Sequence, residues 1–170
     1  MERYQDHVIA YHPDLVLMAG DFGTNSARGG TPLAQFLEDE RQIILDIKKQ
    51  TGALVVVSNL TFLTAFERYS PFNQADLAAL IGFNSGLKQM AVECDSLYAD
   101  IFAAQDMASW TVDPKDGVHL NNLGHRLVAN RIFEVLGQNC SCLSQKAMML
   151  RKAMEKEWCP TRVRQLRDEF

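Results

Sequence analysis

The sequence predicts an α/β fold in which helices cover both faces of a parallel β-sheet. Two short runs of continuous apolar residues, at 13–19 and 53–57, are typical of strands buried on both faces. Helical apolar patterns alternate with these runs along the chain. Strand–helix–strand order requires crossover connections, which give a parallel sheet with helices packed on its faces. We therefore expect a three-layer α/β/α architecture.

Three segments are predicted to be strands. Residues 13–19 read PDLVLMA, and residues 53–57 read ALVVV, which is rich in β-branched side chains. Residues 96–102 form a third, weaker candidate.

Helices are expected between and after the strands. Thr31-Pro32 is typical of a cap followed by a first-turn proline, and Gly52 should end that helix. Its apolar face contains Leu33, Phe36, Leu37, Ile44 and Ile47. A second helix is predicted over 73–93, and a third from about residue 122 to 136. The inward residues of the third should be Leu127, Val128, Ile132, Phe133 and Leu136.

Length and composition fit one globular domain. The chain has 170 residues, of which 47% are hydrophobic and 22% charged, and the formal net charge is −4. This charge gives no indication of a nucleic-acid partner. No apolar run approaches the roughly 18 residues that span a bilayer, and the polar start has no signal-peptide pattern, which favours a cytoplasmic location.

Free thiols in a reducing compartment are expected for Cys94, Cys140, Cys142 and Cys159. A bridge from the 140–142 region to Cys159 is the alternative.

The C-terminal part differs in character from the rest. We divide the chain into a domain at 1–137 and a basic helical extension at 138–170. Residues 144–170 contain seven Lys or Arg side chains against four acids, and Met148, Met149, Leu150 and Met154 could form an apolar stripe. A solvated helix that packs weakly explains this pattern. A helix that binds a partner or dimerises is the alternative.

A loop rich in Asp, Pro and Gly at 113–125 opens directly into the last predicted helix. Within it, Asp116 and His119 lie three residues apart, so their side chains can approach in a turn. A carboxylate that accepts from imidazole Nδ1 fixes the tautomer and leaves the other nitrogen free to take a proton from a nucleophile. The pair is therefore a candidate base with its orienting acid. A turn cap beside a surface histidine is the alternative.

A second candidate site follows the first predicted strand, at residues 18–26 (MAGDFGTNS). In open α/β sheets, ligands bind beyond the carboxyl ends of the strands, so this predicted loop is suitably placed. Gly20 and Gly23 permit tight turns. The Asn25 side chain could donate its amide to a developing oxyanion. The alternative is that Asn25 is only a turn residue.

Together these motifs resemble those of the SGNH hydrolases, also called GDSL-type esterases. The strand that leads to Gly23-Thr24-Asn25 is similar to the family's third block, where Gly-x-Asn-Asp follows a strand. Asp116-Gly117-Val118-His119 with Gly124-His125 is similar to its fifth block, Asp-x-x-His with a downstream Gly-His. The helix entry at 28–32 also recurs in the family. The similarity covers roughly residues 7–137.

The resemblance implies a flavodoxin-like fold and a covalent acyl-enzyme mechanism. It implies that His119 is the general base, Asp116 its orienting partner and Asn25 the oxyanion-hole asparagine, with Gly23 and Thr24 in support. It implies no metal and no cofactor. The implied substrates are small-molecule or carbohydrate esters of acetyl or short acyl groups.

The resemblance also implies that part of the fold is missing. The family's nucleophile lies in a Gly-Asp-Ser-Leu block, and both this block and the second precede the strand at 14–19. Only 13 residues precede that strand here, and none is a serine. The first two strands are therefore expected to be absent, leaving an exposed apolar edge. Ser26, beside the oxyanion asparagine, and Ser58, an expected pocket-lining or capping residue, are poor replacements.

Two functional classes remain open. One is a serine esterase that is nearly inert unless another segment supplies the serine. The other is a non-catalytic remnant, a binding or interaction module whose basic, methionine-bearing tail contacts a partner. In either class, the exposed sheet edge or the C-terminal helix could mediate self-association. A flavodoxin-like nucleotide binder is disfavoured because neither apolar strand is followed by a Gly-rich phosphate loop. We expect His125 to be a packed structural histidine, and His7 and His12 to be surface residues.

Overall fold

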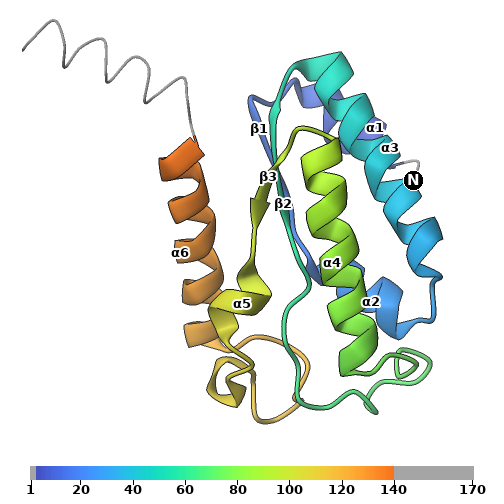
Figure 1. The fold of residues 1–170 in the computed structure, drawn as a ribbon, viewed down its shortest axis with the longest axis vertical. Coiled ribbons are helices and arrows are strands. Elements are labelled where there is room, and N and C mark those ends of the chain that lie inside the picture. Colours follow the sequence, from blue (N-terminus) through green and yellow to red (C-terminus); the bar gives the residue numbers. More distant parts are fainter. Residues whose placement is uncertain (1–2, 140–170) are drawn as a thin grey trace, which may run out of the picture. The chain divides into compact units, whose positions relative to one another are not determined.

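The computed structural model describes residues 3–139, which contain a three-stranded parallel sheet of order β1–β2–β3 (Figure 1). The strands are β1 (Leu15–Met18), β2 (Leu54–Ser58) and β3 (Leu97–Ala99). Leu15 lies opposite Leu54 in the β1–β2 pair, and Val56 lies opposite Leu97 in the β2–β3 pair. The predicted α/β class and all three strands are confirmed.

Helices precede, connect and follow the strands. They are α1 (Arg3–His7), the 3₁₀ turn η1 (Ile9–Tyr11), α2 (Asp21–Arg28), α3 (Leu33–Thr51), α4 (Leu77–Glu93), α5 (Ile101–Gln105), the 3₁₀ turn η2 (Ser109–Thr111) and α6 (Asn122–Asn139). Figure 1 shows α3 and α4 side by side, with α6 on the side of β3 away from them. Helices therefore flank the sheet on both sides.

The core forms between β2 and the pair α3 and α4. The buried residues of α3 are Phe36, Ile44 and Ile47, whose spacing places them on one face of the helix. The Phe36 ring packs on Phe83 of α4 with 5.2 Å between ring centroids. The three central valines of β2, Val55, Val56 and Val57, are each 1% exposed. Continuous burial of this kind produced the unbroken apolar run in the sequence.

Two helix starts differ from the predicted ones. Pro32 is the N-cap of α3 rather than its first residue, and no side chain caps that end. The α4 helix starts at Leu77, four residues later than predicted, because the Asp76 side chain accepts a hydrogen bond from the Ala79 amide at 2.8 Å. Gly52 ends α3 in the left-handed conformation, as predicted.

The predicted loop after β1 is instead the α2 helix, which starts at Asp21. Gly20 does not form a left-handed turn. It approaches the next strand end so closely that a Cβ atom there would lie 1.8 Å from the Asn59 carbonyl oxygen. Gly23 lies within the helix, where a Cβ would meet Leu60 at 2.7 Å and Phe36 at 3.0 Å. Both glycines are thus required for close packing rather than for backbone freedom.

The α6 helix matches its predicted start, but one of its predicted inward residues is wrong. Phe133 is 72% exposed, whereas Val135 is buried.

No helix within residues 3–139 has the length and apolar character that a membrane crossing requires. Cys94 is a buried free thiol. The division at residue 138 stays a prediction, and residues 140–170 with their three cysteines and methionine stripe lie outside the described residues.

The β1 strand forms one edge of the described sheet and pairs only with β2 there. Leu15 is 40% exposed and Leu17 is 49% exposed, and the other two strand residues are half-buried. This matches the apolar edge that the resemblance implied.

Candidate active site

The candidate site lies beyond the carboxyl ends of the strands, where buried amide side chains hold the loops in place. Asn59 follows β2 and is 1% exposed. Its Nδ2 donates to Asp100 Oδ1 at 2.7 Å, and its Oδ1 accepts from the amides of Ile101 and Phe102 at 2.8 and 3.0 Å. One side chain thereby fixes the end of β2 to the start of α5.

Two further amides continue this arrangement. Asn84 of α4 accepts from the Leu60 amide at 2.8 Å. Gln105, which is fully buried, accepts from the Phe62 amide at 2.7 Å and donates to Thr111 Oγ1 at 3.0 Å. The segment after β2 is therefore held from α4 on one side and from α5 on the other.

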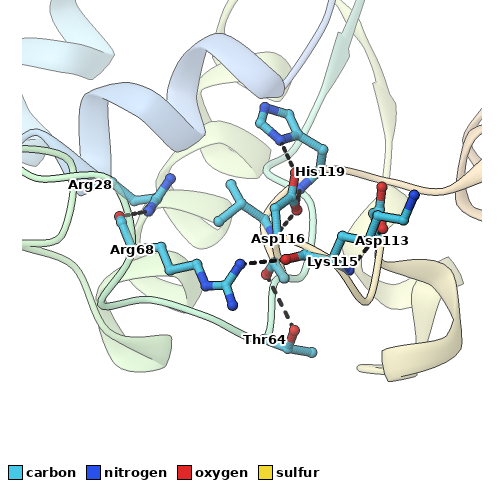
Figure 2. A network of polar contacts seen from close by, with 9 residues as sticks. Arg28, Thr64, Arg68, Asp113, Lys115, Asp116 and His119 are labelled. Carbon is cyan, nitrogen blue, oxygen red and sulfur yellow. Dashed lines mark hydrogen bonds and ion pairs between the residues drawn. The ribbon is translucent and has the colours of Figure 1, made fainter.

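Asp116 and His119 are in direct contact. The His119 Nδ1–H donates to Asp116 Oδ2 at 2.7 Å (Figure 2). The Asp116 Oδ1 accepts from the backbone amides of Val118 and His119 at 2.7 and 3.0 Å. The Asp116 side chain is 19% exposed and that of His119 is 73% exposed. The acid is thus fixed by the backbone while the imidazole projects from the loop.

Backbone hydrogen bonds set the charge state of the acid. The amides of Val118 and then His119 stabilise the carboxylate and lower the pKa of Asp116 to about 2, although burial acts in the opposite direction. An ionised carboxylate can only accept, so at neutral pH the proton between the two side chains belongs to His119 Nδ1. This places the lone pair of the other ring nitrogen, Nε2, away from Asp116.

Gly117 gives the loop its shape. It has φ +72°, and a Cβ there would lie 2.6 Å from the Ala65 side chain. Its carbonyl accepts from the amides of Thr64 and Ala65 at 2.7 and 3.0 Å, and its own amide donates to the Asp113 carbonyl at 2.8 Å. These contacts attach the Asp116 loop to the segment after β2.

A pocket of about 120 Å³ brings the predicted residues together. Thr24 and Asn25 come from α2, and His119 comes from the loop before α6. The rest of its lining is Thr61, Val118, Leu120 and His125. Thr24 is buried, whereas Asn25 is exposed. The structure thus places three of the candidate residues, Thr24, Asn25 and His119, around one small space, and Asp116 contacts His119. Their roles stay predictions.

His125 differs from its predicted environment. It is exposed and lines the pocket, whereas we expected it to be packed. The neighbouring Gly124 takes the buried position, because a Cβ there would lie 2.2 Å from the Thr111 carbonyl oxygen. His7 and His12 are exposed, as predicted.

Neither serine considered as a replacement nucleophile is arranged for that role. The Ser58 hydroxyl accepts from the Gly20 amide at 2.8 Å and donates to the Met18 carbonyl at 3.1 Å, so it joins β2 to the end of β1. Within residues 3–139, no serine hydroxyl is hydrogen-bonded to His119. In the same residues, no three His, Cys, Asp or Glu side chains gather as a metal site would require.

A larger open groove of about 710 Å³ lies elsewhere, along α5, η2 and α6. Trp110, Leu123 and Arg126 are among its lining residues, but none of the candidate site residues is. We place the chemistry in the smaller pocket because it contains the histidine of the ionisable pair.

The family model that describes the GDSL-like lipase/acylhydrolase family matches residues 1–127. The chain belongs to this family. Members of the family act on ester substrates, and the match includes the Asn25 helix and the Asp116–His119 loop. No curated protein sequence matches the chain.

Solved structures share the fold. The acetylxylan esterase Axe2 from Geobacillus stearothermophilus matches with a TM-score of 0.62 and 22% identity, over 79% of this chain and 64% of that one. A protein assigned as a GDSL-like lipase from Parabacteroides merdae matches with a TM-score of 0.61 and 18% identity, over 80% and 66%. The chain therefore spans less than two thirds of either structure. Catalytic mutants of Axe2 include changes of a serine near its N-terminus and of an aspartate and a histidine three positions apart.

Proposed function

We propose that this chain is the acid–base and oxyanion part of a serine esterase that cleaves acetyl or short acyl esters. The observation that supports this proposal most directly is the 2.7 Å contact between His119 Nδ1 and Asp116 Oδ2, in which two backbone amides fix the carboxylate. A carboxylate so fixed holds the imidazole in one tautomer and stabilises the imidazolium that forms during acyl transfer.

Each residue then has one role. His119 Nε2 takes the proton of the attacking hydroxyl and returns it to the alkoxide that leaves. Asp116 stays ionised and balances the positive charge on the ring. The Asn25 amide, which lines the same pocket, donates to the oxyanion of the tetrahedral intermediate.

The substrate class is inferred from the size of the pocket and from the similar structures. A space of about 120 Å³ suits a small acyl group better than a long chain. Axe2 is an acetylxylan esterase, and its catalytic aspartate and histidine have the same spacing as Asp116 and His119. We therefore infer an acetyl ester, carried by a carbohydrate or another small alcohol.

The nucleophile has to come from a segment that residues 3–139 do not contain. In other serine enzymes, loss of the triad nucleophile lowers kcat by a factor on the order of 10⁶. The 170-residue chain alone should therefore be nearly inert. A strand added beside β1 would deliver such a serine to the carboxyl edge of the sheet, where the pocket lies.

The test compares the 170-residue chain with a chain extended at its N-terminus by a strand segment containing Gly-Asp-Ser-Leu. Hydrolysis of p-nitrophenyl acetate and labelling by a fluorophosphonate probe are measured for both. We expect activity only in the extended chain, with at least a thousandfold loss in its His119→Ala variant. The exposed-histidine variant His7→Ala is the matched control. An extended chain that folds but neither labels nor hydrolyses the ester would refute the proposal.

The exposed edge of β1 favours a second candidate function, a non-catalytic interaction module. Leu15 and Leu17 expose apolar surface beside backbone groups that β2 does not use. Under this alternative, the extended chain stays inert while the 170-residue chain associates through β1.

A further inference from the structure

Arg28, the last residue of α2, is a buried cation close to the candidate site. It is 1% exposed, and arginine is rarely buried to this degree without partners. Its Nη2 donates to the Arg68 carbonyl at 2.5 Å, whereas its Nε has no hydrogen-bond partner. The side chain therefore has a defined contact on the segment between β2 and α4.

Arg28 holds both ends of one short segment. Its guanidinium binds the carbonyl of Arg68, and its own carbonyl accepts from the Gln74 amide at 2.9 Å. The two contacts enclose residues 68–74. Tyr69, within this segment, lies beside His119 with 6.4 Å between ring centroids.

The same segment contacts the Asp116 loop. The Arg68 Nη1 donates to the Lys115 carbonyl, immediately before Asp116 (Figure 2). A continuous set of contacts thus runs from Arg28 through Arg68 to Lys115. Asn25 lies three residues before Arg28 on α2, so one helix carries both the oxyanion candidate and this arginine.

The charged groups around Arg28 are consistent with its position near the Asp116 loop. Burial lowers the pKa of the Arg28 guanidinium, while Tyr69, Asp116 and Glu67 act in the opposite direction. An arginine remains charged at neutral pH in spite of such shifts. The Asp116 carboxylate therefore contributes to keeping the buried Arg28 charged.

We propose that Arg28 is a positioning residue that fixes the Asp116–His119 loop relative to Asn25 by holding residues 68–74 between them. The proposal rests on the proposed esterase function, since it gives a reason for the spacing of the base and the oxyanion donor. A buried arginine that only supports the core is the competing explanation.

The two explanations differ in what Arg28→Met changes. If Arg28 positions the loop, amide hydrogen exchange at Val118 and His119 should accelerate about tenfold, since hydrogen bonds to Asp116 loosen. The ring ¹⁵N shifts of His119 should move away from those of a single Nδ1–H tautomer. The amides of β2 should keep their exchange rates within about twofold. Arg41→Met, which removes an arginine paired with Glu93, is the matched control.

The Arg68→Met variant provides a second test of the proposal. It does not disturb the core, because the Arg68 side chain is exposed. It removes the bond to the Lys115 carbonyl and should accelerate the same two amides. The double variant should add little to either single change, because both act through one set of contacts. Should Arg28→Met fail to fold, this variant alone decides.

Unchanged exchange at Val118 and His119 in Arg68→Met would overturn the proposal. So would equal acceleration at β2 and at the loop in Arg28→Met, because that pattern means global destabilisation. These readouts need no nucleophile. An inert extended chain with the expected exchange pattern would therefore refute only the esterase function, and an active one with unchanged amides would refute only the positioning role.

Discussion

The carboxyl ends of β2 and β3 contrast with the outer edge of β1. At the strand ends, Asn59 and Gln105 are buried amides whose donors and acceptors are bonded to neighbouring loops. At the outer edge, Leu15 and Leu17 expose apolar side chains and unpaired backbone. The loops that carry the candidate base are thus held by contacts within residues 3–139, whereas β1 has an open side.

This difference shows which part of the fold is held in place by its own contacts. Side chains that satisfy several buried backbone groups hold the segment after β2, to which the Gly117 carbonyl attaches the candidate Asp116–His119 loop. The open edge is where the fold has room for another strand. Four predictions test this contrast, from the largest expected effect to the smallest.

Asn59→Ala should destabilise the protein most, by about 2–4 kcal/mol. It leaves the buried amides of Ile101 and Phe102 without their acceptor and removes the partner of Asp100. Urea unfolding followed by circular dichroism measures the change, with the exposed Asn73→Ala as control. A loss as small as the control's would show that the strand ends are not held as described.

Glu40→Gln should change the pH dependence of stability near neutrality. Glu40 lies on the α3 face between Phe36 and Ile44, and burial, followed by the charge of Asp39, raises its pKa to about 7. Because this pKa exceeds the ordinary value of 4.5, stability is fully present below about pH 4.5 and is lost as pH rises through 7. The variant should therefore be more stable than the wild type at pH 8, by on the order of 1–3 kcal/mol.

The control for this prediction is Glu38→Gln, an exposed position on the same helix. Unfolding midpoints at pH 4.5, 6 and 8 give the comparison. Parallel pH curves for wild type and Glu40→Gln would show that Glu40 is not desolvated.

Asp116→Asn should show the opposite pH dependence, with a smaller effect. The pKa of Asp116, about 2, lies below its ordinary value of 3.8, so its contribution is present above about pH 4 and disappears as pH falls toward 2. We expect the variant to be less stable by about 1 kcal/mol at pH 7 and equal to the wild type near pH 2. Asp106→Asn, at an exposed position, is the control. If Asp116→Asn is still less stable than the wild type at pH 2, the effect comes from the shape of the side chain and not from its charge.

Leu17→Lys should alter stability least, within about 0.5 kcal/mol, since the side chain is half exposed already. Its expected effect is on association, because a lysine on an edge strand opposes pairing between copies. Sedimentation velocity across a concentration series measures this. Leu45→Lys, equally exposed but on α3, is the matched control. Equal association of both variants and the wild type would show that β1 does not mediate it.

The sequence was most informative where local pattern and tertiary role agree. The valines of β2 form an unbroken apolar run because both faces of that strand are buried. The spacing of Asp116 and His119 predicted their contact because a single turn closes it. Family resemblance then supplied the expectation that Asn25 lies near this pair, and Asn25 and His119 line one pocket.

It was least informative where a distant contact decides the local structure. Two glycines in residues 18–26 indicated a loop, yet α2 forms because Gly20 and Gly23 pack against the end of β2. The contact of Arg28 depends on the path of residues 68–74, which no local pattern specifies. The exposure of His125 follows from Gly124 taking the position against Thr111.

The parallel register has a consequence for synthesis on the ribosome. Leu15 pairs with Leu54 and Val56 pairs with Leu97. The partner of β1 therefore lies about forty residues further along the chain, and so does the second partner of β2. Translation proceeds at roughly 5–20 residues per second, so β1 is made seconds before β2 exists. Helix α3 forms from local contacts in that interval, while the apolar β1 stays available to other chains. The strand at the edge of the described sheet is therefore also exposed for seconds before its described partner is made.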